Sequence, residues 1–217
     1  MADIFQEVDE EIRRERLKEL WDRYGNLIVV GALVIVLGVA GWRGYQWWDH
    51  KKSAEAGAAF EAAIGLSEAG KHAEAEASFA KIAADGTSGY RTLARFHEAG
   101  ELGQTDPQAA VKAYEALAAD SSIGRVMQDL AAVRAGLILV DTAPYAELSG
   151  RLEPMTASDR VFHNTAREIL AFSAWRASDR AAARHWADMI MTDPETPSGT
   201  RSRVEVLMAL TAPDGKS

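Results

Sequence analysis

The chain has 217 residues, a formal net charge of −8 at pH 7 and no cysteine. The lack of thiols excludes a disulfide framework, a cysteine nucleophile and a thiolate metal site. The acidic balance argues against a nucleic-acid-binding protein, because such proteins present a basic surface.

Residues 1–23 form a charged segment that we expect to be an amphipathic helix. Apolar side chains recur there at helical spacing in two sets, on either side of the stretch GluGluIleArgArgGluArg. The sets are Ile4, Phe5, Val8 and Ile12, then Leu17, Leu20, Trp21 and Tyr24. The helix either docks to a partner or membrane interface, or only fixes the topology, and its acidic residues disfavour firm adhesion to anionic lipid.

The stretch 24–48 is predicted to span a membrane. The 16 residues of Leu27–Trp42 carry no charge and would form a helix of ~24 Å. Aromatic residues on both sides extend the helix toward the ~30 Å thickness of a hydrocarbon core. They are Tyr24, Tyr45, Trp47 and Trp48.

Two other interpretations of this apolar stretch remain open. A cleaved signal peptide needs a short basic leader, whereas 26 mostly polar, net acidic residues precede Leu27. A buried core helix is disfavoured by Gly31, Gly38 and Gly41, because glycine is a poor helix former in water and common in membrane helices.

Basic residues near the two ends of the anchor predict its orientation. Five precede it and three follow it: Arg13, Arg14, Arg16, Lys18 and Arg23, then Arg43, Lys51 and Lys52. This bias favours a cytoplasmic N-terminus, so the chain from about Ser53 on would lie in the periplasm. We therefore expect a single-pass protein of the bacterial inner membrane.

Residues 49–211 are predicted to be a purely helical domain, and 212–217 a flexible tail. Sustained period-two alternation is lacking, and turn residues divide the chain into short helical segments. The breaks fall at Gly70–Lys71 and at stretches starting at Asp85, Thr105, Asp120, Asp141, Ala177 and Asp193. Asp106 is a predicted N-cap, with Pro107 at the first helical position.

A helical motif repeats along this domain with a period near 36 residues. A small residue is followed four positions later by a large one and three further by an apolar one. The copies are Ala75, Phe79 and Ile82, then Ala110, Tyr114 and Leu117, then Ala182, Trp186 and Met189. A copy centred on Ala146 is degenerate, because Gly150 and Glu153 interrupt it.

This period is typical of tetratricopeptide repeats, in which antiparallel helix pairs stack into an α-solenoid. Preceding helices fit the first-helix role, with small and apolar positions at Ala59, Ala62, Ala63 and Leu66 and at Ala166, Ile169, Leu170 and Ser173. The helix from about Ser198 to Leu210 is a predicted C-terminal cap. The alternative is an ordinary helical bundle.

Enzymatic and cofactor-binding roles find little support in the residues. The five histidines, at positions 50, 72, 97, 163 and 185, lack helical metal-ligand spacing, and no HExxH motif or glycine-rich phosphate loop is present. From Ser53 on, the chain carries 23 acidic and 16 basic residues, a net charge of −7, which again disfavours nucleic acid. We expect a non-enzymatic protein without metal or cofactor.

The order of these parts resembles the ancillary SecYEG translocon subunit family, the YfgM-like tetratricopeptide proteins of the bacterial inner membrane. A charged tail precedes a single anchor ending in GlyTrpArg, with Tyr45 and Trp47 close behind, and alanine-rich repeats follow. The opening DIFQEVDEEIRRERLKELWDRYG resembles the alphaproteobacterial form and departs from the enterobacterial one. The resemblance implies a scaffold beside the Sec translocon that contacts periplasmic chaperones and newly exported polypeptides.

A different adaptor role, in a respiratory or other cell-envelope complex, is the alternative hypothesis. For either role, alignment of the last repeat places Asn164, Arg167 and Trp175 at first-helix positions that commonly face a binding groove. Trp175 alternatively packs against the capping helix. If replacement of all three residues by alanine left crosslinked adducts unchanged, the binding surface would lie elsewhere, at the juxtamembrane stretch around Trp47 and Trp48.

Overall fold

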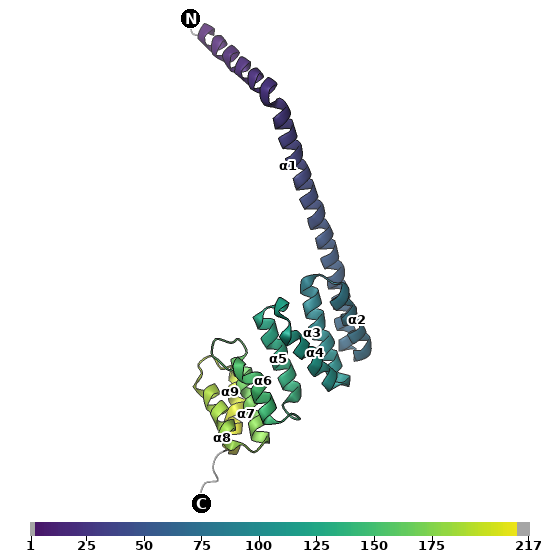
Figure 1. Cartoon of the computed structure of the whole chain (residues 1–217), viewed down its shortest axis with the longest axis vertical. Helices are drawn as coiled ribbons and strands as arrows, with labels where there is room; N and C mark the ends of the chain where they lie inside the picture. The colour runs from purple at the N-terminus through teal and green to yellow at the C-terminus, as the bar shows by residue number, and fades with distance from the viewer. Residues whose placement is uncertain (1–2, 212–217) are drawn as a thin grey trace, which may run out of the picture. The chain divides into compact units, whose positions relative to one another are not determined.

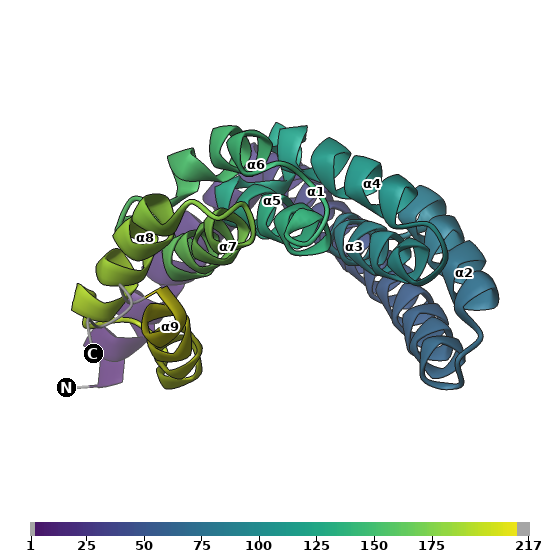
Figure 2. The ribbon, with the colours of Figure 1, turned by 90° about the horizontal axis from the view of Figure 1, so that it is seen from below.

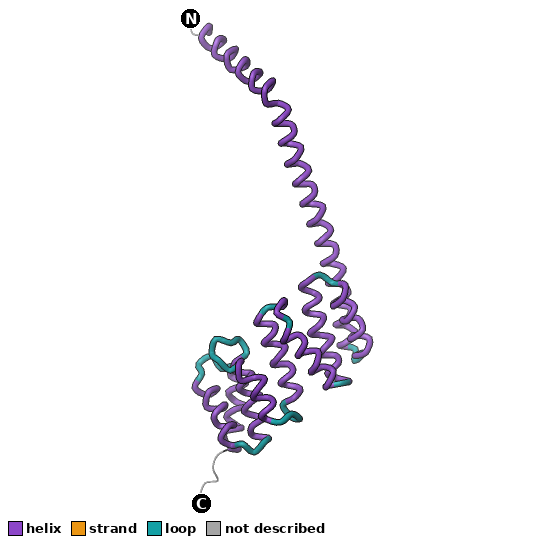
Figure 3. The backbone as a smooth tube through the Cα atoms, viewed as in Figure 1, coloured by secondary structure: helices purple, strands orange, loops and turns teal. Residues whose placement is uncertain are grey.

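A computed structural model describes residues 3–211, with side chains at Lys18 and from Trp21 onward. Within that range the chain is helical between short loops and contains no strand (Figure 3), which confirms the all-α prediction. The side chains of the first apolar set in the N-terminal segment, and those of Leu17 and Leu20 in the second set, lie outside the described ones. The predicted C-terminal tail, residues 212–217, also lies outside the described residues. The chain divides into two compact units, one up to Ala54 and one from Glu55 on.

The first unit consists of the N-terminal part of α1, a 66-residue helix that spans Asp3–Glu68 (Figure 1). The predicted division between anchor and domain at residues 48 and 49 therefore lies inside a continuous helix, as does the division at Ala54. Of the helices described, this is the one long and apolar enough to cross a membrane. Among the side chains described in this unit, the large apolar ones of the membrane-capable stretch are exposed: Leu27 and Ile35 are 68% and 67% exposed.

The second unit is built from helical hairpins stacked side by side, and the stack runs across Figure 2 from α2 to α8. The C-terminal end of α1 begins it. The elements that follow are α2 (His72–Asp85), α3 (Ser88–Thr105), α4 (Pro107–Ala119), η1 (Ser121–Ile123), α5 (Arg125–Leu139), α6 (Tyr145–Leu152), η2 (Glu153–Met155), α7 (His163–Arg176), α8 (Arg180–Thr192) and α9 (Ser198–Thr211). Helices α3, α5, α7 and α9 form an inner row, and α2, α4, α6 and α8 form an outer row.

Every predicted helix break lies between two of these helices, because the breaking residues act locally. Asp106 caps α4 as expected, since its carboxylate accepts a hydrogen bond of 3.0 Å from the Ala109 amide. One stretch was not predicted: the short helix η2 and the irregular residues 156–162, which separate α6 from α7.

The repeated motif forms the buried side of the outer helices. In α2 and α4 all six motif residues are buried, and Phe79 is completely enclosed. In α8 Trp186 is buried, whereas Ala182 and Met189 are half-buried and the fully buried stripe lies one residue later. That stripe is Ala183, Ala187 and Ile190. The buried side is turned because α9 also packs on α8, with Val204 against Ala187 and Ile190.

The predicted first-helix positions have mixed outcomes. In α7 all four proposed positions, Ala166, Ile169, Leu170 and Ser173, are buried, which confirms the alignment there. In α1 the prediction was wrong for Ala59 and Ala62, which are exposed. Phe60 sets the buried side of that helix instead, because its ring packs 5.4 Å from the Phe79 ring and turns the neighbouring alanines outward.

The degenerate repeat corresponds to α6, which has only 8 residues. Leu148 and Leu152 still bury their side chains in the main core cluster. Gly136 of α5 allows this close packing, because a Cβ at that position would lie 2.8 Å from Cδ1 of Leu152.

Candidate binding site

The loop between α8 and α9 starts with a turn organised by Asp193. Its Oδ1 accepts a hydrogen bond of 2.9 Å from the Glu195 amide, two residues along the chain. Thr196 secures the same loop by donating its hydroxyl to the Ile190 carbonyl at 2.7 Å. Aspartate before proline favours this kind of turn because its side chain bonds its own backbone.

The other oxygen of the same carboxylate pairs with α7. Nη1 of Arg167 donates to Oδ2 of Asp193 at 2.8 Å, and Nε donates to the Thr156 carbonyl at 2.9 Å. Asn164, one turn earlier, accepts a longer bond of 3.3 Å from the same Nη1. Arg167 is only 5% exposed. Its buried charge is compensated by the opposite charge of Asp193 and by these hydrogen bonds, as a buried ion requires.

A histidine completes the cluster around Asp193. Nε2 of His163 lies 2.8 Å from Oδ2 of Asp193, and its Nδ1 lies 2.5 Å from the Arg160 carbonyl oxygen. The Glu195 amide, followed by His163 and Arg167, lowers the pKa of Asp193 to about 2. The carboxylate is therefore a fixed negative charge at any ordinary pH.

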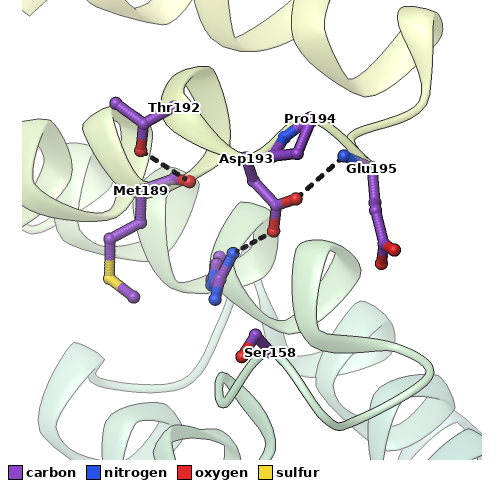
Figure 4. A pocket seen from close by; sticks show the side chains of 7 residues that line it. Ser158, Met189, Thr192, Asp193, Pro194 and Glu195 are labelled. Carbon is purple, nitrogen blue, oxygen red and sulfur yellow. Dashed lines mark hydrogen bonds and ion pairs between the residues drawn. The ribbon is translucent and has the colours of Figure 1, made fainter.

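A pocket of about 520 Å³ opens beside this cluster (Figure 4). Seven residues line it: Ser158, Arg167, Met189, Thr192, Asp193, Pro194 and Glu195. In Figure 4 Ser158 lies below Asp193, on a separate segment of the chain. The volume is in the range of small-ligand sites, and the lining combines charged, hydroxyl and apolar groups.

The three predicted binding residues do not form one site. Arg167 lines the pocket and Asn164 lies next to it, but both are buried in the network that joins α7 to the α8–α9 loop. Trp175 lies 11 residues after Asn164 on α7, about 16 Å along the helix. It is 43% exposed.

Sequence reasoning identified Arg167 but missed its partners, Asp193 and His163. The helix break at Asp193 was visible because Asp-Pro is a local signal. That this aspartate pairs with residues 26 and 30 positions earlier was not visible, because the pairing depends on how α8 folds back on α7.

A second candidate surface lies on the inner row of helices. The exposed large apolar side chains of the second unit, within the part of the chain described, are Leu93, Val126, Leu137, Val161, Trp175, Val206 and Leu210. All lie on α3, α5, α7 or α9, apart from Val161 just before α7. The inner row, and not the outer one, therefore carries the exposed large apolar side chains of this unit among the described residues.

The comparisons with known proteins give one family match. The model of the tetratricopeptide repeat-like domain matches residues 18–185. No curated protein and no solved structure matches the chain. The match ends within α8, so the α8–α9 loop with Asp193 and Glu195 lies beyond the part that the family model covers.

Proposed function

Because the chain belongs to the tetratricopeptide repeat-like domain family, we propose that it is a membrane-anchored, non-enzymatic scaffold that binds other proteins. The observation that carries this proposal is that, among the described residues of the second unit, the exposed large apolar side chains lie on the inner helices, apart from Val161 just before α7. The inner surface of a solenoid is where such proteins bind extended ligands. Trp175 is the strongest single anchor there, since tryptophan is enriched among the residues that dominate binding energy.

The partners that we propose are the Sec translocon, periplasmic chaperones and newly exported polypeptides. The support is the resemblance of the whole chain to the ancillary translocon subunits: charged tail, one apolar helix, then repeats. A bacterial inner membrane, with the N-terminus in the cytoplasm and the repeats in the periplasm, fits the five basic residues before the apolar stretch and the three after it.

Co-purification tests the choice of partner. The tagged full-length chain, extracted from membranes in mild detergent, is expected to bring SecY with it. Consistent absence of SecY, with a different envelope complex in the eluate, would favour the adaptor role instead. Alkaline phosphatase fused after Ser217 should be active, and activity only in an N-terminal fusion would reverse the proposed topology.

Crosslinking in membranes tests the binding surface. Trp175→Ala should reduce adducts with exported chains or chaperones, because it removes a large apolar contact from α7. Ala116→Ser is a matched control, since Ala116 is an exposed residue of the outer helix α4. Equal adducts in both variants would contradict the proposed surface. Asn164 and Arg167 suit this test less well, because their replacement also removes buried hydrogen bonds.

A further inference from the structure

The pocket beside Asp193 contains a hydrogen-bond donor that the fold does not use. Arg167 bonds through Nε and Nη1, and its Nη2 has no partner among the described residues. Among the described residues, two side-chain polar atoms are sealed from solvent without a partner, Arg160 Nε and Ser173 Oγ, and Nη2 of Arg167 is not one of them. Since Arg167 lines the pocket, Nη2 is the part of the buried guanidinium that is available to a ligand.

Other groups around the pocket are also unused. The Glu195 carboxylate and the Ser158 hydroxyl make no hydrogen bond or ion pair in the part of the chain described, although the Glu195 amide bonds Asp193. Met189 and Pro194 supply apolar surface between them. The pocket thus offers two donors, one free carboxylate and an apolar wall.

The charges decide which ligand fits. Asp193 is balanced by Arg167 at 2.8 Å and approached by His163 at 2.8 Å, so the uncompensated charge of the lining is that of Glu195. A carboxylate ligand would be repelled by Glu195, and a purely apolar ligand would leave Nη2 of Arg167 without an acceptor. A polypeptide segment with a basic side chain satisfies both, because its main-chain carbonyl accepts from Arg167 while its cation pairs with Glu195.

We propose that this pocket binds a lysine- or arginine-bearing segment of a partner polypeptide. The main-chain carbonyl accepts from Nη2 of Arg167 and from Ser158, the aliphatic stem lies on Met189 and Pro194, and the cation pairs with Glu195. The net charge of −7 from Ser53 on attracts such a segment at long range. This inference rests on the proposed role in protein binding and adds the kind of sequence that is bound.

Met189 provides a reporter inside the pocket. The full-length chain in detergent micelles, labelled with ¹³C at the methionine methyl groups, is titrated with three probes. They are acetyl-Ala-Lys-Ala-amide, the same peptide with norleucine, and the same peptide with glutamate. The Met189 signal, assigned from a Met189→Leu variant, should move saturably with the lysine probe, while the signal of Met127 on α5 stays in place.

The expected order of affinity is lysine, then norleucine, then glutamate. Loss of an exposed ion pair corresponds to a change of up to about fivefold, so Glu195→Gln should weaken the lysine probe by that factor and leave the norleucine probe unchanged. Glu205→Gln is the matched control, because Glu205 is an exposed carboxylate on α9 outside the pocket lining. High salt should reduce the preference for lysine.

Three results would overturn the assignment: an unmoved Met189 signal, equal binding of lysine and norleucine, or tightest binding of glutamate. The proposed scaffold role fails separately. If the tagged chain still captures proteins while the lysine probe leaves Met189 unmoved, only the pocket assignment is wrong. If the probe binds but no protein partner is recovered from membranes, the scaffold proposal is wrong.

Discussion

The first hairpin of the repeat unit, the end of α1 with α2, and the last, α7 with α8, differ in the groups that hold them to their neighbours. Both contact a buried charge: in the first, Glu101 of the neighbouring α3 accepts a hydrogen bond of 2.5 Å from Ser67 and lies 2.7 Å from His72. In the first, aromatic rings from α1, α2 and α3 pack together, with centroids 5.4 Å apart for Phe60 and Phe79 and 5.0 Å apart for Phe79 and His97. In the last, α7 is joined to the α8–α9 loop by the charged cluster of His163, Arg167 and Asp193.

The two hairpins also differ in whether their polar groups are all used inside the fold or are partly free to bind a ligand. In the first hairpin the rings of Phe60 and Phe79 carry no polar group, and both oxygens of the buried Glu101 carboxylate already have partners, Ser67 and His72. A buried arginine has five donors in a fixed fork, and the fold of the last hairpin uses only part of them. The hairpin held by charges is therefore the one that can offer a polar pocket, while the aromatic hairpin serves the core.

The largest effect is expected from Phe79→Ala in the aromatic hairpin. Phe79 is completely buried, and truncating such a ring should lower the free energy of unfolding by about 3–5 kcal/mol through lost burial and a residual cavity. Urea denaturation of the chain in mild detergent, followed by circular dichroism, measures this loss. A loss below about 1 kcal/mol would show that the cluster is not a core.

In the charged hairpin, Asp193→Asn keeps the shape but removes the charge. Arg167 and His163 would then face a neutral amide, and we expect a loss of about 2 kcal/mol, typical of hydrogen bonds to charged groups. Glu153→Gln, an exposed carboxylate in the preceding loop, is the control. Equal melts for the two variants would mean that the cluster does not stabilise the hairpin.

The two hairpins should also respond to acid at different pH. Burial lowers the pKa of His97 below its usual value of 6.5, so the folded state binds this proton less readily than the unfolded state. The first hairpin should therefore lose stability as the pH falls below about 6.5, whereas Asp193, with a pKa of about 2, contributes its stability down to about pH 4.

Hydrogen exchange of the two hairpins between pH 7.5 and 5, corrected for intrinsic rates, measures this difference. His97→Phe should remove the extra opening of α3 at low pH. If α3 in that variant opens as strongly as in the native chain, another group carries the acid response.

The smallest effect is expected at the surface of the first hairpin. Lys71 and Glu74 lie 3.5 Å apart, with side chains 54% and 62% exposed. Lys71→Ala should change the free energy of unfolding by less than about 0.5 kcal/mol, because solvent screens such pairs. A larger loss in the same urea denaturation would mean that this exposed pair, and not only the buried Glu101 with Ser67 and His72, stabilises the first hairpin.

The helices, the membrane-capable segment and the repeat could all be predicted from local patterns in the amino-acid sequence. Helix ends at Asp85, Thr105 and Arg176 could be predicted because glycine, proline and capping aspartate act on backbone within a few residues of themselves. The motif in α2 and α4 was equally visible, since helical period fixes which side chains share a face.

The face that each helix buries and the charges that meet depend instead on how the helices pack together. Alanine at positions 59 and 62 is compatible with either side of α1, and the packing of Phe60 chose between them. The buried side of α8 shifted by one residue because α9 covers it. Asp193 meets Arg167 across 26 residues, so the pairing depends on the return of α8 along α7, which no local pattern encodes.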